Sequence, residues 1–162
     1  MTNYVKTIRQ KIGHDMLIMA GAGVFVHRDG RILMQKRRDN GLWSVCHGGA
    51  IEVGETVEET AKRELSEETG LVANTLNLFG VYSGADMFHT YPNGDKVYNI
   101  SVFYSCDDFN GELLLQAEEI LELRWFETDS LPEVAEFAGA RAFRDFVQKI
   151  KDTRGQPCLT SR

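Results

Sequence analysis

Short apolar runs alternate with turn residues along most of this chain, which is the pattern of strands that pack against a core. Asp29-Gly30 is a favoured two-residue hairpin turn, and Asn40-Gly41 is a second turn signal. The pattern predicts strands at residues 20–27, 32–37, 43–46, 78–83, 96–105 and 120–126, with a further short strand at 111–115.

Three segments have helical character, and with the strands they predict a mixed α/β domain. Residues 4–11 predict a short helix or arm. Residues 56–69 contain no Pro or Gly, begin with a Thr56–Glu59 capping-box pattern and are closed by Gly70. Pro132 opens a third predicted helix, whose apolar residues at helical spacing are Val134, Phe137, Ala138, Ala142, Phe143 and Phe146.

The acidic residues of the 56–69 helix lie beside its apolar face rather than opposite to it. At about 100° per residue, Glu68 falls about 40° and Glu67 about 60° from Glu64 around the helix axis. The same sector holds the apolar residues Val57, Ala61 and Leu65. Packed carboxylates repel one another, and Mg²⁺ or Mn²⁺ would remove that conflict because both ions prefer carboxylate and water oxygens. A solvated Glu-rich face is the alternative.

The spacing of residues around this helix argues against a solvated face. Residues 49–71 read GAIEVGETVEETAKRELSEETGL. This segment resembles the signature of the Nudix hydrolases, a MutT-like family, written G-x5-E-x7-R-E-U-x-E-E-x-G-U with U aliphatic. It matches at every specified position: Gly49, Glu55, Arg63, Glu64, Leu65, Glu67, Glu68, Gly70 and Leu71. With average residue usage, chance would produce this match on the order of once in 10⁸ sequences.

The resemblance implies a fold and a reaction. The fold is an α/β/α sandwich with a mixed β-sheet and a catalytic loop-helix-loop. The reaction is hydrolysis of a nucleoside diphosphate linked to another group, with water attacking a phosphorus of the pyrophosphate bridge and Mg²⁺ or Mn²⁺ as cofactor. ADP-ribose-like sugars, nucleoside triphosphates and dinucleotides all remain open as substrates.

The resemblance also implies a set of metal-binding residues. Glu64, Glu67 and Glu68 would be the metal ligands on the helix. Glu55 would support the metal shell or its waters, and the backbone carbonyl of Gly49 can face a metal in such sites. A bound ion of this kind lowers the pKa of a water molecule and neutralises charge on the phosphate oxygens.

Catalytic roles follow from the same positions. Arg63 would orient a neighbouring carboxylate through a salt bridge. One glutamate must accept the proton of the attacking water, and Glu64 and Glu67 are candidates. Many family members place a further metal-binding or basic carboxylate just before the last strand, where this chain has Glu118 and Glu119. Which glutamate takes the proton stays open.

The end of the second strand offers candidate substrate contacts. Arg37 or Arg38 would meet a phosphate, because a guanidinium matches phosphate geometry. Trp43 could stack on a nucleobase. The structural alternatives are a solvated strand end for the arginines and a core anchor for the tryptophan.

Two further positions bear on the substrate. Residues 83–94 form a long connection, in which Phe88 and Tyr91 are candidate contacts for a base or sugar, with a packed capping loop as the alternative. His47 stands before the paired glycines, where many family members have Pro. This departure predicts either a differently shaped loop or a histidine that reaches substrate phosphate.

Length and charge narrow the function further. The chain has 162 residues, which predicts one Nudix domain over residues 1–151 and a flexible tail over 152–162. The net charge of −6 argues against nucleic acid as a partner and leaves a small nucleotide, bridged by metal ions, as the expected one.

Cysteine usage and hydropathy indicate a cytoplasmic protein without a membrane partner. The three cysteines, Cys46, Cys106 and Cys158, form no C-x-x-C pair and support neither a disulfide framework nor a zinc cluster. Residues 16–26 are apolar, but Asp15 adjoins them and they resemble the first core strand of the family rather than a secretion signal. Dimers are frequent in the family, so a homodimer stays open.

Two other functional classes compete with the enzyme. A Nudix-fold module that senses a nucleotide without cleaving it would be expected to lose signature carboxylates, and none is lost here. A loosely Ca²⁺-binding structural domain would not need helix-borne ligands or Arg63. The complete carboxylate set therefore favours hydrolysis.

Overall fold

The computed structural model describes residues 4–38, 41–45, 47–115, 120–134 and 139–155. Its helices are α1 (Tyr4–Ile12), α2 (Val57–Thr69) and α3 (Ala140–Gly155), with one 3₁₀ turn, η1 (Ala85–Met87). Its strands are β1 (Leu17–Arg28), β2 (Arg31–Arg37), β3 (Trp43–Ser44), β4 (His47–Ala50), β5 (Val72–Ala73), β6 (Asn77–Tyr82), β7 (Phe88–Thr90), β8 (Lys96–Cys106), β9 (Phe109–Asn110) and β10 (Ile120–Glu127). Among the described residues, none of the helices combines the length and apolar character that a bilayer crossing requires.

The strands form a mixed sheet, as predicted. Its main path runs β10-β2-β1-β8-β6, while β3, β4 and β7 pair with β2, β1 and β8. β1 and β8 are parallel, from Leu17 opposite Val97 to Val26 opposite Cys106, and the other pairs of the sheet are antiparallel. β5 and β9 make a separate two-stranded sheet. The predicted strands at 20–27, 32–37, 78–83, 96–105 and 120–126 are therefore confirmed.

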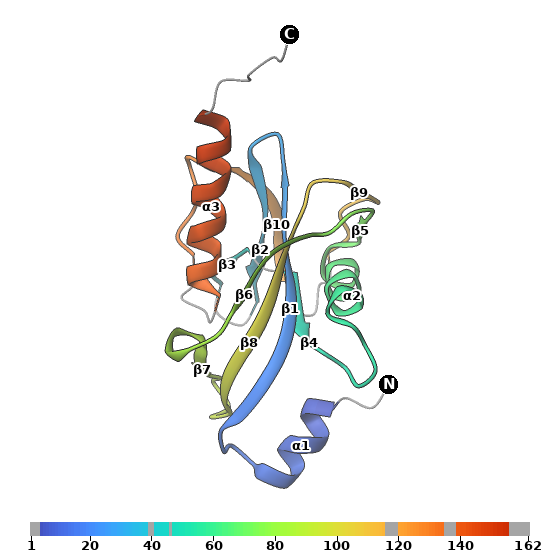
Figure 1. Ribbon diagram of the computed structural model, residues 1–162, viewed down its shortest axis with the longest axis vertical. Helices are drawn as coiled ribbons and strands as arrows, with labels where there is room; N and C mark the ends of the chain where they lie inside the picture. Colours follow the sequence, from blue (N-terminus) through green and yellow to red (C-terminus); the bar gives the residue numbers. More distant parts are fainter. Residues whose placement is uncertain (1–3, 39–40, 46, 116–119, 135–138, 156–162) are drawn as a thin grey trace.

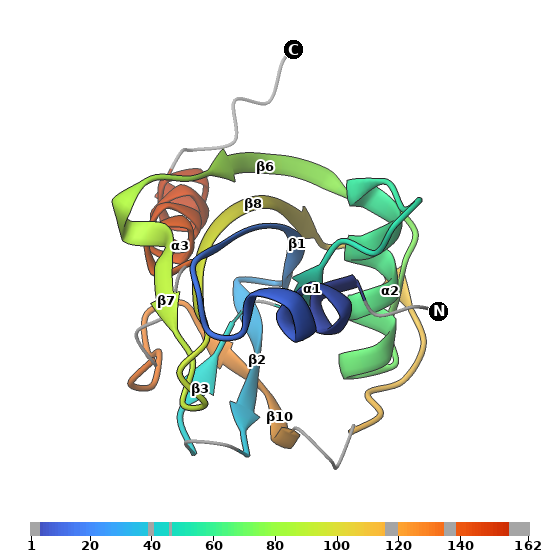
Figure 2. The same ribbon diagram turned by 90° about the horizontal axis from the view of Figure 1, so that it is seen from below.

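Alternation along the central strands divides the core between the two faces of the sheet. Val24 belongs to one apolar cluster together with Leu65 of α2, while its neighbour Phe25 belongs to a second cluster with Phe146 of α3. Figures 1 and 2 show α2 and α3 on opposite sides of the sheet. The predicted α/β/α sandwich is confirmed, and α2 is held against the sheet by its own apolar stripe.

The hairpin between β1 and β2 has the predicted two-residue turn. Asp29 has φ 51° and Gly30 has φ 74°, the left-handed pair that a type I′ turn requires. Arg154 near the end of α3 donates a hydrogen bond to the Asp29 carbonyl (3.0 Å) and another to Thr128 Oγ1 (3.0 Å). A side chain at Gly30 would collide with the Arg154 side chain. The β1–β2 hairpin and the end of α3 are therefore in close contact.

The strand predicted at residues 111–115 is wrong. β9 ends before it, at Asn110, where it pairs with β5, and residues 111–115 have no regular structure. The Leu114 N–H instead donates to the Thr69 carbonyl (2.8 Å). This hydrogen bond satisfies a backbone carbonyl at the C-terminal end of α2. The two residues are far apart along the chain, so the alternation of apolar residues in the sequence does not reveal the contact.

The third predicted helix is present as α3, but its predicted start at Pro132 is wrong. Val134 forms a parallel bridge with Trp43 rather than a helical turn, and α3 begins at Ala140. Phe137 and Ala138 lie outside the described residues. At the other end α3 continues to Gly155, so the first four residues of the predicted tail are helical. The prediction for residues 156–162 falls outside the described part of the chain.

The remaining connections are more regular than predicted. Within residues 83–94, η1 leads into β7, which pairs with β8. α1 is a helix rather than an arm and lies beyond the end of the sheet where β1 begins (Figure 1). Its residues include none that are buried, and Arg9 connects it to the Lys96 carbonyl (2.8 Å) and the Asp95 carboxylate (3.5 Å).

Candidate active site

α2 begins and ends where the sequence predicts. Thr56 Oγ1 accepts a hydrogen bond from the Glu59 N–H (3.2 Å), and the Glu59 carboxylate accepts one from the Thr56 N–H (2.8 Å). Gly70 has φ 75°, and its N–H donates to the Ser66 carbonyl. The capping box and the glycine C-cap are confirmed. Because both ends are fixed, so is the direction in which each carboxylate leaves the helix.

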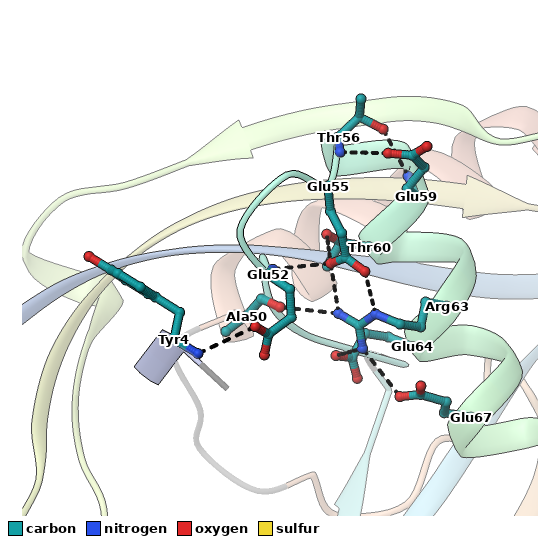
Figure 3. A network of polar contacts seen from close by, with 10 residues as sticks. All are labelled: Tyr4, Ala50, Glu52, Glu55, Thr56, Glu59, Thr60, Arg63, Glu64 and Glu67. Carbon is teal, nitrogen blue, oxygen red and sulfur yellow. Dashed lines mark hydrogen bonds and ion pairs between the residues drawn. The ribbon is translucent and has the colours of Figure 1, made fainter. Parts of the chain in front are cut away.

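Arg63 lies among three carboxylates (Figure 3). Its guanidinium donates to both oxygens of Glu55 (2.7 and 3.0 Å), to Glu64 Oε1 (2.7 Å) and to Glu67 Oε2 (3.2 Å). It also donates to the Ala50 carbonyl at the end of β4 (3.3 Å). The predicted orienting role of Arg63 thus has a geometric basis, because one rigid planar group fixes several acids at once.

Glu55 is held more completely than the other acids. Besides Arg63, its Oε2 accepts hydrogen bonds from Thr60 Oγ1 (2.8 Å) and from the Glu52 N–H (3.1 Å). The sequence analysis missed Thr60, although its buried position one turn after Thr56 was a usable signal. Both oxygens of Glu55 are therefore occupied by protein donors. This suits the predicted supporting role, and direct metal ligation by Glu55 stays a prediction.

The acids around Arg63 differ in their pKa values. The Arg63 hydrogen bond lowers the pKa of Glu55 to about 2. Burial raises the pKa of Glu64, although the hydrogen bond from Arg63 opposes this shift. The same contacts, that with Glu55 first, raise the pKa of Arg63. Arg63 therefore favours the ionised form of Glu55, whereas burial disfavours the ionised form of Glu64.

Gly49 brings β4 against the carboxylate of Glu64. A Cβ at Gly49 would lie 2.5 Å from Glu64 Oε1, so a larger residue there would displace the Glu64 carboxylate. The adjacent Gly48 is more restricted, because a Cβ there would collide with the Ala22 backbone of β1. The paired glycines therefore let β4 approach both β1 and the Glu64 side chain closely, while metal binding by the Gly49 carbonyl stays a prediction.

Glu68 faces a different partner, His47 of β4. The imidazole of His47 is fully buried, its Nδ1 lies 3.2 Å from Gln35 Oε1 and the same nitrogen lies 3.3 Å from Glu68 Oε2. The pair with Glu68 is close but not aligned as a hydrogen bond, so Glu68 Oε2 and His47 Nε2 are buried without a hydrogen-bond partner among the described residues. The full burial of the ring favours the alternative of a differently shaped loop, and contact of His47 with substrate phosphate stays a prediction.

The donor set fits a hard divalent cation in its chemistry. Within the described ranges, no three Asp, Glu, His or Cys side chains converge closely enough to form a ready-made metal cage. Arg63 instead draws Glu55, Glu64 and Glu67 towards itself. A buried oxygen of Glu68 has no donor among the described residues, and burial raises the pKa of Glu64. A cation bound beside these two carboxylates would compensate both effects.

The predicted phosphate and base contacts lie on β2 and β3. Arg37 and Arg38 are exposed at the end of β2. Trp43 is half-buried, its ring centroid lies 4.7 Å from that of Phe126, and it packs on the α3-side core. Its packing favours the core-anchor alternative for the tryptophan, while phosphate binding by the arginines stays a prediction.

The other candidate contacts lie on β7 and just after it. The ring centroid of Phe88 lies 5.4 Å from that of Tyr98 on β8, and 41 % of Phe88 is exposed. Burial raises the pKa of Tyr91, and the nearby positive charge of Arg37 opposes that shift, which brings two predicted contacts into one neighbourhood. Their binding roles stay predictions. Glu118 and Glu119 lie outside the described residues.

Several known proteins resemble this chain in sequence or in fold. An ADP-ribose pyrophosphatase of Methanocaldococcus jannaschii is 35 % identical over 76 % of this chain and 69 % of its own. An NAD-capped RNA hydrolase of Actinobacillus succinogenes is 34 % identical over 62 % of this chain, which spans only 34 % of that protein. The crystal structure of a MutT NUDIX hydrolase from Burkholderia pseudomallei, 28 % identical, superposes with a TM-score of 0.66 over 82 % of this chain and 97 % of its own.

The family assignment rests on the whole domain. The model of the NUDIX domain matches residues 17–148, from the first residue of β1 into α3. That range contains the sheet, the capped α2 and the glycines of β4, the features from which the candidate site was assembled. The protein therefore belongs to the Nudix family of hydrolases.

Proposed function

We propose that this protein is a metal-dependent pyrophosphohydrolase that cleaves a nucleoside diphosphate linked to another group. The observation that carries the proposal is the set of signature carboxylates, complete in sequence and held on one capped helix and the loop just before it, beside the β4 glycines. A sensing module has no need to keep Glu64 in a buried place where its charge is disfavoured. Such a cost is expected where ionised groups are required for chemistry.

Glu64, Glu67 and Glu68, with the Gly49 carbonyl, would hold the divalent ion, Mg²⁺ or Mn²⁺. When bound, the ion lowers the pKa of a water molecule and neutralises charge on the pyrophosphate oxygens. Arg63 keeps Glu55, Glu64 and Glu67 together before the ion arrives. Such preorganisation avoids the reorganisation that loose acids would undergo during the reaction.

Glu67 is the described acid best placed to accept the proton of the attacking water, and in that role it would leave metal ligation to Glu64, Glu68 and the Gly49 carbonyl. Its side chain is 55 % exposed, whereas those of Glu64 and Glu68 are 16 % and 14 % exposed. Its hydrogen bond with Arg63, at 3.2 Å, is also longer than that of Glu64. An exposed carboxylate can meet a water and release the proton to solvent. Glu118 and Glu119 are the competing candidates.

An ADP-ribose-like substrate is the first choice among those that the reaction allows. The support is the Methanocaldococcus jannaschii relative, of which this chain covers 69 %. The NAD-capped RNA hydrolases share only about a third of their length with this chain, and they support the broader class of dinucleotide pyrophosphates. In all of these the broken bond joins two phosphorus atoms through one oxygen.

Hydrolysis of a nucleotide panel in ¹⁸O-water tests the proposal. Purified protein is incubated with Mg²⁺, Mn²⁺ or EDTA and with ADP-ribose, NAD, a nucleoside triphosphate or a diadenosine polyphosphate. We expect metal-dependent cleavage of at least one compound, with ¹⁸O in a single phosphate product that identifies the attacked phosphorus. If every compound stays intact while one binds tightly, the sensing module replaces the enzyme.

A further inference from the structure

Three elements meet at His47. The histidine is on β4, its partner Gln35 is on β2, and Glu68 is on α2. His47 is fully buried and Gln35 is 4 % exposed. The polar groups of this trio therefore depend on one another rather than on bulk water.

The contact with Gln35 fixes the chemistry of the ring. An amide oxygen can only accept, so the Nδ1 that lies 3.2 Å from Gln35 Oε1 is the nitrogen that carries hydrogen. That nitrogen also lies 3.3 Å from Glu68 Oε2. The positive end of the N–H dipole is thus the nearest polar group of His47 to the buried carboxylate oxygen.

The surroundings distinguish the two oxygens of Glu68. Oε2 is buried, so the 14 % of the side chain that is exposed must come from its other atoms. A carboxylate with one oxygen enclosed against the His47 ring presents the other in a defined direction. Partners of this kind, which touch a metal ligand rather than the metal, orient ligands in many metal sites.

We propose that His47, held in one tautomer by Gln35, is a positioning residue that fixes the Glu68 carboxylate for a divalent cation. The inference rests on the proposed function, because it assumes that Glu68 serves as a ligand. A purely structural role explains the trio less well. An apolar side chain at position 47 would fill the same space without leaving a ring nitrogen buried and unpaired.

A shape-matched pair of substitutions at position 47 separates the donor from the packing. Asn and Leu have similar shapes, but only Asn keeps an N–H near the position of Nδ1. We expect His47→Leu to weaken Mn²⁺ binding by about 10- to 100-fold, the usual effect of losing such a partner, and His47→Asn to retain most of the affinity. Free Mn²⁺ is measured by electron paramagnetic resonance during titration of the substrate-free protein.

Controls keep packing and folding apart from positioning. Thr128→Val removes a distant buried hydroxyl, which accepts a hydrogen bond from Arg154, and should lower the melting temperature without changing Mn²⁺ affinity. If His47→Leu does not fold, Gln35→Met keeps the histidine but frees its tautomer, and it should also weaken Mn²⁺ binding.

The outcomes distinguish the inference from the function on which it rests. Wild-type affinity for Mn²⁺ in His47→Leu, or in Gln35→Met when the first variant does not fold, overturns the positioning role while the hydrolase stands. Equal losses in His47→Leu and His47→Asn also overturn it, because packing would then explain both. A wild-type protein that binds no Mn²⁺ overturns the proposed metal dependence and the inference together.

Discussion

At the start of α2 the Glu55 carboxylate accepts hydrogen bonds on both oxygens, whereas near its end the buried oxygen of Glu68 lacks one among the described residues. Arg63 lowers the pKa of the first acid, and burial raises the pKa of Glu64 between them. The difference in hydrogen bonding shows that glutamates have two separate uses in this region. Satisfied carboxylates hold the loop to the helix, and unsatisfied ones keep the capacity to bind a cation.

The largest expected effect comes from the exposed acid in the second half of the helix. Glu67→Gln should lower kcat by about 10³-fold, as expected for loss of an acid–base group, and leave the melting temperature close to wild type because the side chain is half-exposed. Steady-state kinetics and calorimetry measure the two effects. Glu112→Gln, an exposed acid elsewhere, is the control. Retained activity with a large fall in melting temperature would show that Glu67 is structural.

The second prediction concerns Arg63, which hydrogen-bonds both to Glu55 before α2 and to Glu64 within it. Arg63→Met leaves Glu55 and Glu64 without their shared donor and should cost about 2 kcal/mol of unfolding free energy, because these hydrogen bonds join charged groups. For a domain of this size the melting temperature would fall by roughly 6 °C. Arg63→Lys keeps the charge but loses the fork and should lie in between. Equal stability in Arg63→Met and wild type would contradict the role of Arg63 as the centre of this group.

The third prediction tests the N-terminal cap of α2 separately from the carboxylates in its second half. Thr56→Ala removes the N-cap and should cost about 1 kcal/mol, while Thr56→Ser should cost much less. Mn²⁺ affinity should stay at the wild-type value in both, since the cap does not touch Glu64, Glu67 or Glu68. Urea denaturation and Mn²⁺ titration measure the two properties. Loss of Mn²⁺ binding in a Thr56 variant would show that the N-terminal cap of α2 affects its metal-binding carboxylates.

The smallest expected effect is a pair of opposite pH dependences in metal-free buffer. The pKa of Glu55 is lowered in the folded state, so its stabilising contribution is present above pH 4.5 and is lost as the pH falls towards about 2. The pKa of Glu64 is raised, so its ionisation opposes folding as the pH rises above 4.5. Glu55→Gln should therefore lower the melting temperature at pH 7, and Glu64→Gln should raise it. Calorimetry measures both melting temperatures. If the two substitutions changed the melting temperature in the same direction, the proposed difference between Glu55 and Glu64 would be contradicted.

Local signals in the sequence predicted α2 best. Thr56, Glu59 and Gly70 define its ends by contacts within a few residues, and the Asp29-Gly30 turn is equally local. The two failures depend on partners far along the chain. Leu114 satisfies the end of α2, and Val134 pairs with Trp43, so neither segment follows its own alternation or helical spacing.

The candidate site divides in the same way. The spacing of the carboxylates and Arg63 was visible in the sequence because one helix and the loop just before it carry them. The contact between His47 and Glu68 was not visible, since it depends on how closely β4 packs against α2. The glycines of the signature contain that information only indirectly, through the side chains that they exclude.

The N-terminal helix is attached in a way that sets its dynamics. α1 has no buried residue, and polar contacts of Arg9 with Lys96 and Asp95 join it to the rest of the domain. Polar contacts at the surface resist separation weakly, so this helix should open and close many times for each unfolding of the sheet. In deuterated water its amide protons should exchange well before those of β1 and β8, and raised salt should widen the gap.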